Sequence, residues 1–405
     1  MANHFGTPAL KRRDSSIGFR MSAVIAVVCA GLWAYLVLGR GGFWLCRVRD
    51  DIHPAPMEPG LGEWPSVVAV VPARDEAGLI RRSLRSLLEQ DYPGTFSVIV
   101  VDDNSTDDTA AAAGSLVGSG RHPLTVLAGR GLPPGWTGKL WALHQGIGAA
   151  SETRPDYLLL TDADIVHAPD TVSMLVRKSL RGGLVLASLM ARLRCISPAE
   201  RIHVPAFVYF FQMLFPFSWV ERRDGATAAA AGGCMLVRAD ALRRAGGIGA
   251  IRNALIDDCA LASRLKTIGP IWLGLTDRAV SIRPYETFAA VRDMISRSAY
   301  AQLRYSPALL AATIAAMLLT FAAPPALAVL AAGWPGYVGV VLWLAMAASF
   351  VPTLRFYRLS PLWGFAMPAI ALLYMCYTLH SALRHIRRRG GRWKGRVHVN
   401  APGVP

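Results

Sequence analysis

Cysteine is scarce in this sequence: its 405 residues include six cysteines, and no two of them form a Cys-x-x-Cys pair. Without paired spacing, the chain offers neither the framework of a disulfide-rich protein nor the ligands of a structural zinc site. We therefore expect the parts that carry these cysteines to face a reducing compartment. No internal repeat or low-complexity segment is evident either.

Acidic residues are also few relative to basic ones, 27 against 43, which gives a formal charge of +16 and an isoelectric point near 10.1. Such an excess predicts an anionic partner: nucleic acid, a phosphate-bearing substrate or acidic lipid headgroups. Seven basic residues lie between positions 384 and 396, directly after the last apolar segment, where anionic lipid explains them. A nucleic-acid-binding function is therefore disfavoured.

Long apolar segments are present at both ends of the chain. Residues 1–20 form a polar, basic N-terminus, and residues 21–39 carry no charge over a length that can span a bilayer. A signal peptide is the alternative for this segment, but no clear small-x-small cleavage site follows it. We predict a transmembrane anchor at 21–39, followed by a linker at 40–66 that is rich in proline, glycine and acidic residues.

The chain becomes apolar again over residues 307–384, which we predict to be a C-terminal transmembrane region with two or three spans. The candidate spans are 308–332, 336–353 and 362–383. The first of them contains Pro324-Pro325, so a kinked or re-entrant segment is the expectation there. Residues 286–306 predict an amphipathic helix at the membrane surface. Residues 385–405 form a strongly basic tail.

Residues 67–285 predict a soluble α/β domain. Short β-branched or leucine-rich runs mark its strands, at 67–71, 97–103, 125–129 and 157–164. The segment between the first two strands, 79–90, places its apolar residues on one helical face. Strands that alternate with helices form parallel β-α-β units, so we expect a mostly parallel, doubly wound, Rossmann-like sheet. Continuous apolar strands are what a sheet covered on both faces requires.

Aspartates follow two of these strands, and ligands bind at the carboxyl ends of strands in such sheets. The second strand ends in Asp102 and Asp103, and the fourth ends in Asp162 and Asp164. Carboxylates and phosphates both prefer a hard divalent cation such as Mg²⁺ or Mn²⁺. An Asp-x-Asp at a strand end directs both side chains to one side of a turn, which suits a metal shared with a substrate diphosphate.

A third acidic pair, Asp257-Asp258, could take a proton from an attacking hydroxyl. Each acidic group also has a purely structural interpretation. Residues 102–108 could be a solvated turn and helix N-cap, and Asp162 with Asp164 could form another turn. The third pair could simply charge the first turn of a helix. The order of the pairs, two of them at the ends of apolar strands in one domain, favours the functional interpretation.

From about Val67 to Tyr305 the sequence resembles the family 2 glycosyltransferases, which are inverting enzymes with the GT-A fold. Six segments in the family's order carry the resemblance: VVPARDEA (70–77), VVDDNSTDDT (100–109), GWTGKLWALHQG (135–146), DAD (162–164), GGCMLVRADALRRAGG (232–247) and IDDCALASRL (256–265). Asp75 stands where the family usually has Asn, and His144 stands in place of another Asn.

The resemblance implies roles for the matching residues. Asp162 and Asp164 would hold the metal on the diphosphate. Asp258 would be the general base, with Asp257 beside it. Lys139 would reach the diphosphate, unless it is an ordinary surface lysine. The resemblance assigns nucleotide-sugar binding to Pro72, Asp75, Glu76, Asp102, Asp103, Lys139 and Asp162. Arg304 is a further expected nucleotide-sugar contact.

One departure from the family concerns its membrane-bound members, many of which carry Gln-x-x-Arg-Trp. This chain has Gln302, Arg304 and Tyr305 at a different spacing, so we do not expect a processive polymerase. Arg304 would lie near the diphosphate or the membrane surface. Two further features stay open: His167 is a turn residue or a metal ligand, and the aromatic run at 204–220 is a core helix or a bilayer-surface helix that admits a lipid.

The overall pattern is most similar to the bacterial glycosyltransferase subgroup associated with hopanoid biosynthesis. The resemblance implies a membrane-bound, metal-dependent enzyme that moves a sugar from a nucleotide-diphosphate donor to a hopanoid-related lipid. A ceramide-type or polyprenyl-phosphate-type sugar transferase is the alternative, and a non-catalytic scaffold that keeps the fold is a different class. The sequence does not predict an oligomeric state.

A bacterial inner membrane location follows, with several spans and the α/β domain on the cytoplasmic side, where nucleotide sugars are found. One anchor before this domain and three full spans after it would place both basic termini outside, against the positive-inside tendency. We therefore expect one C-terminal segment to be re-entrant, or the N-terminal segment not to be a full span. The segment with Pro324-Pro325 is the first candidate for re-entry.

Overall fold

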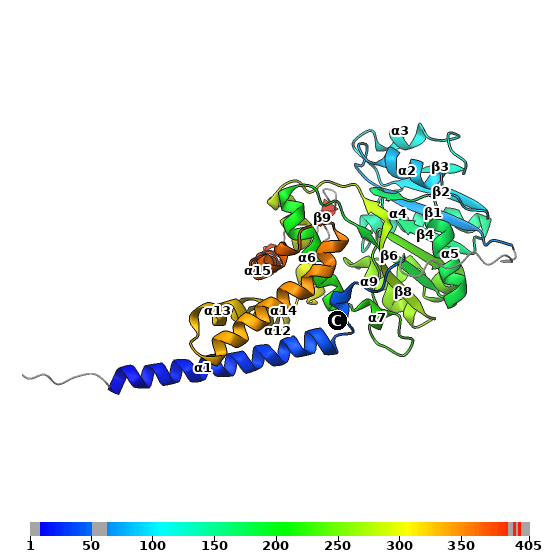
Figure 1. Cartoon of the computed structure of the whole chain (residues 1–405). Coiled ribbons are helices and arrows are strands. Elements are labelled where there is room, and N and C mark those ends of the chain that lie inside the picture. Colours follow the sequence, from blue (N-terminus) through cyan, green and yellow to red (C-terminus); the bar gives the residue numbers. More distant parts are fainter. Residues whose placement is uncertain (1–8, 51–62, 388–391, 394–395, 398–405) are drawn as a thin grey trace, which may run out of the picture.

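The computed structural model describes residues 9–50, 63–387, 392–393 and 396–397. An α/β domain lies at one end of the molecule, and long apolar helices extend away from it (Figure 1). Parts of the predicted N-terminus, linker and basic tail lie outside the described residues. Near the tail, β9 (Arg392–Trp393) and β10 (Arg396–Val397) form a short antiparallel pair.

An eight-stranded sheet organises the α/β domain, with the order β3-β2-β1-β4-β7-β6-β8-β5. Its strands are β1 (Val67–Ala73), β2 (Phe96–Asp102), β3 (Leu124–Ala128), β4 (Tyr157–Thr161), β5 (Ile165–His167), β6 (Leu186–Arg192), β7 (Cys234–Arg238) and β8 (Ile271–Ser281). Among these strands, four neighbouring pairs are parallel and three are antiparallel. The predicted α/β class is confirmed, but the sheet is mixed.

The parallel prediction holds for β3, β2, β1 and β4, and β7 breaks the pattern. Strand β7 begins beside the end of β4, where Cys234 pairs with Thr161. After β6, the chain forms α6 (Pro198–Leu214) and α7 (Phe217–Val220) without crossing back over the sheet. It therefore re-enters the sheet at the edge from which it left, which makes β7 antiparallel to β6.

Helices cover both faces of the sheet, as its continuously buried strands require. On one face lie α2 (Ile80–Leu88), α3 (Thr109–Gly114) and α5 (Thr171–Gly182); on the other lie α4 (Gly138–Ala150), α8 (Ala239–Arg244) and α9 (Asp257–Lys266). Short 3₁₀ turns occur at Phe43–Leu45, Ser151–Thr153 and Ile248–Ile251. Alternate residues of β1 point to opposite cores, with Val68 and Val70 on the α4 face and Val71 on the α2 face.

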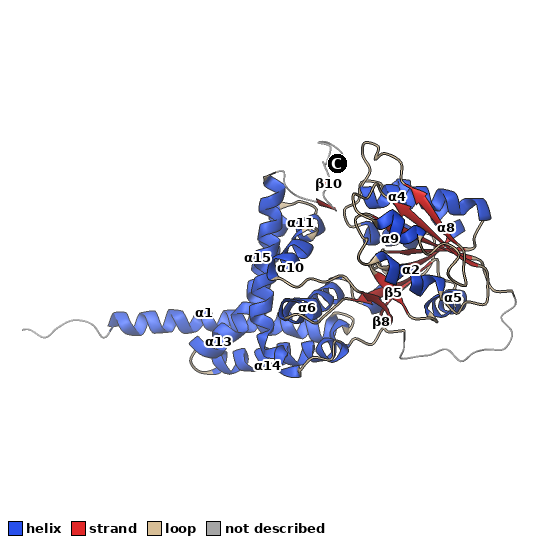
Figure 2. Ribbon diagram, turned by 90° about the horizontal axis from the view of Figure 1, so that it is seen from above, coloured by secondary structure: helices blue, strands red, loops and turns tan. Residues whose placement is uncertain are grey.

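Helix α6 lies between the α/β domain and the apolar helices (Figure 2). It begins with a capping box in which Ser197 and Glu200 exchange hydrogen bonds between side chain and backbone. Phe211 packs on the core of the α/β domain, whereas Tyr209 and Phe210 belong to the core of the apolar helices. The aromatic run is thus a buried helix that joins the two parts.

Four helical segments are long and apolar enough to cross a membrane: Gly18–Gly39, Pro307–Leu330, Trp334–Phe356 and Pro361–Ile386. The first segment comprises α1 (Ala9–Ala34) and a π turn (Tyr35–Gly39). The second comprises α12 (Pro307–Met317), a π turn (Leu318–Ala322) and α13 (Ala323–Leu330). The third is α14 (Trp334–Phe356), and the fourth comprises a 3₁₀ turn (Pro361–Ala366) and α15 (Met367–Ile386).

Because Pro324 lacks an N–H, it leaves the Thr320 carbonyl without its helical partner. The indole N–H of Trp33 donates to that oxygen at 2.9 Å.

The predicted amphipathic helix at 286–306 is divided into α10 (Phe288–Ser296) and α11 (Ala299–Gln302). A side chain from another segment breaks it. The Ser381 hydroxyl donates to the Ser296 carbonyl at 2.5 Å and accepts from the Tyr300 N–H, 3.1 Å away. These two backbone groups would otherwise pair within one helix, so the inserted hydroxyl accounts for the interruption.

Candidate active site

A cavity of about 390 Å³ opens at the carboxyl edge of the parallel strands. Its polar wall is made by charged side chains from separate elements: Arg74, Glu76, Lys139, Asp162, Asp164, Asp257, Asp258 and Arg283. Pro72 from the end of β1 also lines it. The sequence separates these residues by up to 211 positions, and the sheet topology brings them together.

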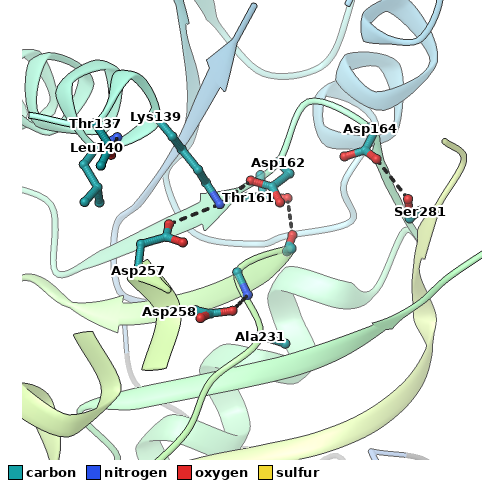
Figure 3. A network of polar contacts seen from close by, with 12 residues as sticks. Thr137, Lys139, Leu140, Thr161, Asp162, Asp164, Ala231, Asp257, Asp258 and Ser281 are labelled. Atoms are coloured by element: carbon teal, nitrogen blue, oxygen red, sulfur yellow. Dashed lines mark hydrogen bonds and ion pairs between the residues drawn. The ribbon is translucent and has the colours of Figure 1, made fainter. Parts of the chain in front are cut away.

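Lys139 lies between two of the predicted acidic groups (Figure 3). It stands in the first turn of α4, where the Thr137 side chain caps the helix by accepting from the Leu140 N–H at 3.3 Å. Its Nζ is 2.8 Å from Asp162 Oδ1 and 3.2 Å from Asp257 Oδ2. Burial alone would lower the pKa of Lys139, but these carboxylates outweigh it and raise the pKa, so the lysine is a fixed cation.

Asp164 is held by the end of β8, on the other side of Asp162. Its Oδ2 accepts from the Ser281 hydroxyl at 2.9 Å and from Arg283 Nε at 3.0 Å. The same guanidinium forms an ion pair with Glu76. Arg283 thereby fixes the orientation of two carboxylates, and their charges raise the pKa of the guanidinium although burial opposes this.

Asp258 lies in the first turn of α9, where backbone amides hold both of its carboxylate oxygens. The Gly232 N–H donates to Oδ2 at 2.9 Å, and the Cys259 N–H donates to Oδ1 at 2.7 Å. Burial, with a further contribution from Asp257, raises the pKa of Asp258 to about 6. A side chain on Gly232 would place its Cβ 3.2 Å from Lys139 Nζ, so glycine leaves room in this part of the cavity.

Asp162 and Asp164 suit a metal ion by the chemistry of their donors, since carboxylate oxygens are hard ligands. Within the described part of the chain, no group of three or more His, Cys, Asp or Glu side chains could hold a metal by itself. Mg²⁺ commonly takes one or two carboxylates and completes its coordination with substrate phosphates and water. The donor chemistry of the two aspartates therefore fits a hard divalent ion.

The opposite wall of the cavity is apolar. It is lined by Met190 and Leu193 from β6 and its following loop, by Phe207 and Phe211 from α6, and by Met294 from α10. Helices α6 and α10 also contact the apolar helices through residues such as Phe210 and Val291. The cavity thus has a charged wall on the sheet and an apolar wall directed toward the candidate spans.

Three residues predicted to bind the nucleotide do not line this cavity. Asp75 accepts from the Thr106 N–H at 2.7 Å, Asp102 accepts from Ser105, and Asp103 is fully buried. These contacts join the loop after β1 to the loop after β2. Asp75 lies in the loop after β1, and Asp102 and Asp103 lie at the end of β2; their nucleotide-binding role stays a prediction.

Arg304 also lies outside the cavity lining. It is exposed after α11 with a φ of 51°, while Arg297 and Ser298 at the break between the two helices line the cavity. His167 is buried on β5, and its Nε2 is 2.9 Å from the Thr161 hydroxyl. The structure therefore favours the non-ligand interpretation of His167.

Several cavity residues were not anticipated from the sequence: Arg74, Thr137, Arg283, Tyr285, Met294 and Arg297. Arg283 follows β8 in the segment 281-SIRP-284, so the strand-end argument used for the aspartates could have identified it. No comparable signal marks Met294 or Arg297, because their position depends on how α10 packs against α6 and α15.

Residues 68–246 match the family described as "Glycosyl transferase family 2". This match covers less than half of the chain. An N-acetylglucosaminyltransferase of Rhizobium leguminosarum bv. viciae is 34% identical over 117 residues, which cover 28% of this chain and 25% of that protein. A 4,4'-diaponeurosporenoate glycosyltransferase of Staphylococcus aureus is 32% identical over 114 residues, or 28% of each chain. The matches thus span about a quarter of each curated relative's length.

Among solved structures, the α/β domain and the apolar helices together are similar to the mannosyltransferase PcManGT from Pyrobaculum calidifontis. The two align with a TM-score of 0.52 and 20% sequence identity, over 90% of this chain and 99% of that one. At this level of identity the likeness shows the fold. The predicted GT-A fold is confirmed.

Proposed function

We propose that the protein is a membrane-bound inverting glycosyltransferase that moves a sugar from a nucleotide-diphosphate donor to a lipid hydroxyl. The observation that carries this proposal is the juxtaposition in one cavity of Asp258, with its pKa raised to about 6, and an apolar wall built from α6 and α10. A base beside charged groups suits the donor end, and an apolar wall suits the acceptor. The match of residues 68–246 to glycosyl transferase family 2 supports the sugar-transfer chemistry.

Asp258 is the general base of the proposed reaction. Its carboxylate accepts the proton of the acceptor hydroxyl while that oxygen attacks the anomeric carbon. The bond from this carbon to the diphosphate oxygen breaks at the same time, and the nucleoside diphosphate leaves on the opposite face, which inverts the anomeric configuration. The amides of Gly232 and Cys259 keep the carboxylate in one orientation during this step.

The leaving diphosphate lies against the charged wall in this proposal. Lys139 supplies a fixed cation there, and Arg283 keeps Asp164 and Glu76 in place. Mg²⁺ or Mn²⁺ held by Asp162 and Asp164 would supply positive charge to the diphosphate. The Pyrobaculum mannosyltransferase is described in complex with GDP-Man and Mn²⁺, which supports the same combination of donor and ion for this chain.

The acceptor hydroxyl belongs to an amphiphile whose apolar part contacts Phe207, Phe211 and Met294. The sequence pattern favours a hopanoid-related lipid. A polyprenyl-phosphate acceptor is the second candidate. The bacterial inner membrane, with the transferase domain facing the cytoplasm, is the proposed location.

The test is sugar transfer by purified protein in detergent, with host lipid extract, a panel of nucleotide sugars, and Mg²⁺ or Mn²⁺. Asp258→Asn and the double variant Asp162→Ala/Asp164→Ala are compared with Asp240→Asn. Asp240 pairs with Arg238 at the far end of β7, outside the cavity, so it is a matched control. We expect a new glycolipid from one donor that is lost on chelation and in both cavity variants but persists in the control.

Two outcomes would contradict the proposal. Full activity of Asp258→Asn would remove Asp258 from the role of base. Absence of both product and metal-dependent nucleotide binding would favour a non-catalytic scaffold that keeps the fold. Nucleotide binding without product from the host lipids would reject these lipids as the acceptor source and redirect the search to other acceptors.

A further inference from the structure

The first apolar helix and the hairpin formed by α13 and α14 extend side by side to a common far end. Near the α/β domain, Cys46 Sγ and Thr353 Oγ1 lie 3.4 Å apart, so the end of α14 lies beside the chain that follows α1. At the far end, a Cβ on Gly333 would lie 3.6 Å from the ring of Phe19. Phe19 is in the first turn of the span Gly18–Gly39, so α14 covers the whole depth of that span.

The last apolar segment behaves differently, although it is 26 residues long. It begins on the domain side, where the guanidinium of Arg192 lies 5.7 Å from the ring centre of Tyr357. Its 3₁₀ turn then packs against the middle of α14, where Trp343 Nε1 donates to the Phe365 carbonyl at 3.2 Å. A Cβ on Gly364 would lie 2.7 Å from the Ala347 carbonyl.

The depth of this turn follows from helix geometry. Ala347 precedes the end of α14 at Phe356 by nine residues. At a rise of 1.5 Å per residue, this places the turn about 14 Å from the domain end of the helix. A hydrocarbon core is about 30 Å thick, so the segment reaches only about half of the bilayer depth before it turns.

From this turn, α15 runs across the direction of α1 (Figure 2) and contacts two helices that line the cavity. The Tyr374 hydroxyl donates to the His203 carbonyl of α6 at 2.8 Å, and the Ser381 hydroxyl donates to the Ser296 carbonyl of α10. The His385 ring stacks on that of Tyr305 with centroids 4.3 Å apart. Since α6 and α10 line the cavity, the end of α15 lies on the domain side.

The exposed and buried faces of the segment fit this path. Non-helical backbone at membrane depth is tolerated where protein buries it, and the 3₁₀ turn has Gly364 buried against α14. Large apolar side chains of α15 recur at intervals of three, four or seven residues on the exposed face: Leu372, Leu379, Leu383 and Ile386. This stripe contacts lipid when α15 lies in the domain-side half of a bilayer.

We propose that residues 357–387 are a re-entrant segment that enters and leaves the bilayer on the side of the transferase domain. The interaction surface formed by α10 and the end of α15 then lies at the lipid headgroups, where the exposed Arg297 and Arg387 meet anionic lipid. Arg292 and Arg384 flank them and share Asp293 at 3.2 Å each. The inference rests on the proposed membrane location. The segment that re-enters is then the last apolar segment, and not the segment with Pro324-Pro325 that the sequence suggested first.

The path has two consequences. The chain crosses the bilayer three times, so the end of α15 lies on the side of the transferase domain, where basic residues are favoured, whereas the basic N-terminus before the first span lies on the opposite side. The cavity, which Met294 and Arg297 of the α10–α11 region line, opens at the depth of the headgroups. A lipid hydroxyl can therefore reach Asp258 without leaving the membrane.

Membrane sidedness tests the proposal, in the full chain and independently of sugar transfer. Single cysteines are added at three exposed positions: Asp224→Cys in the transferase domain, Ala332→Cys between α13 and α14, and Arg387→Cys after α15. Each variant is treated with a membrane-impermeant maleimide in right-side-out and inverted vesicles. The unmodified chain, with its six cysteines, gives the background.

We expect Arg387→Cys to react from the same side as Asp224→Cys, and Ala332→Cys to react from the opposite side. Reaction of Arg387→Cys from the side of Ala332→Cys would make the last segment a full span and overturn the proposal. Reaction of all three from one side would overturn it as well, because the hairpin would then not cross. Neither result depends on the donor or the acceptor, so a failure of the proposed function is distinguishable.

Discussion

Lys139 Nζ lies 2.8 Å from Asp162 Oδ1, so the cation at the start of α4 faces the first aspartate of the Asp-x-Asp turn directly. Asp257 contacts the same ammonium group from the start of α9. The lysine thus joins the proposed metal-binding side of the cavity to the proposed base side. Removing its charge should affect both sides.

We predict that Lys139→Met lowers the rate of sugar transfer about 100-fold, the usual effect of losing one group that stabilises developing charge. The diphosphate would lose a fixed cation, and Asp162 and Asp257 would lose the charge that separates them. Initial rates at saturating donor measure the effect. Lys178→Met is the matched control, since Lys178 lies over the Trp272 ring outside this cavity. An unchanged rate in Lys139→Met would exclude the lysine from the reaction.

The pH dependence of sugar transfer should reveal the ionisation of the proposed base, Asp258. Because burial raises the pKa of Asp258 to about 6, we expect kcat/KM to fall below pH 6 as the carboxylate takes up a proton and can no longer accept one. Lys139 lowers this pKa, so in Lys139→Met the fall of kcat/KM at low pH (the acid limb of the pH profile) should begin at a higher pH. Initial rates between pH 5 and 8 would show the limb; an acid limb that stays in place in Lys139→Met would contradict the electrostatic argument.

The raised pKa of Asp258 makes the fold more stable at low pH, whereas the proposed reaction needs the higher pH at which Asp258 is ionised. The folded chain holds a proton on Asp258 at a pH where the unfolded chain has already lost it, so this group stabilises the fold below its unfolded pKa. That contribution disappears as the pH rises through about 6. The proposed base is therefore ionised for activity at a cost in stability, as is common for groups whose pKa is tuned for function.

A second titration is expected from His167, which lies behind the cavity. The Thr161 hydroxyl donates to the Gly233 carbonyl at 2.8 Å and so accepts from His167 Nε2, which leaves Nδ1 buried without a partner among the described residues. Burial lowers the pKa of His167 from 6.5 to about 4. Below pH 6.5 the unfolded chain binds a proton that the folded chain does not, so acid destabilises the fold.

We predict that this histidine makes the free energy of unfolding fall by up to about 1.4 kcal/mol per pH unit between pH 6.5 and 4. His167→Gln, which cannot gain the proton, should have a flatter dependence. Thermal midpoints of the detergent-purified protein across this range measure the slope. His144→Gln, at an exposed position, is the matched histidine control. Equal slopes in wild type and His167→Gln would show that His167 titrates normally.

The sequence was sufficient for the fold class and for much of the charged wall, because both depend on local patterns. Aspartates at the ends of apolar strands indicated the edge of the sheet, and the structure places Asp162, Asp164 and Asp258 around one cavity there. The antiparallel strand β7 was not predictable in this way, because its direction depends on where α6 and α7 pack. Arg283 was missed because one charge after a long strand has no distinctive spacing.

The path of the last apolar segment could not be read from composition. Its mean hydropathy of 1.6 is close to the 1.8 of α14, yet the two take different paths. The difference arises from contacts between distant residues: the carbonyl of Phe365 meets Trp343, and Ser381 meets Ser296. Such pairings have no signature in a single sequence, since each residue type is common in helices of this kind.

Ser381 provides the last prediction, because its hydroxyl occupies the break between α10 and α11. It is buried and satisfies both the Ser296 carbonyl and the Tyr300 N–H. In Ser381→Ala, either these backbone groups lose their partners, at a cost of about 1–3 kcal/mol, or they pair with each other and close the two helices into one. Both results alter the position of Met294 and Arg297 at the cavity.

We therefore expect Ser381→Ala to lower the thermal midpoint by several degrees or to raise the KM for the lipid acceptor several-fold. The charged wall does not contact Ser381, so the KM for the nucleotide sugar should stay near its wild-type value. Ser263→Ala is the control, since Ser263 donates to a helical carbonyl on the exposed side of α9. If Ser381→Ala matched wild type in midpoint and in both KM values, the inserted hydroxyl would have no role in shaping the acceptor side of the cavity.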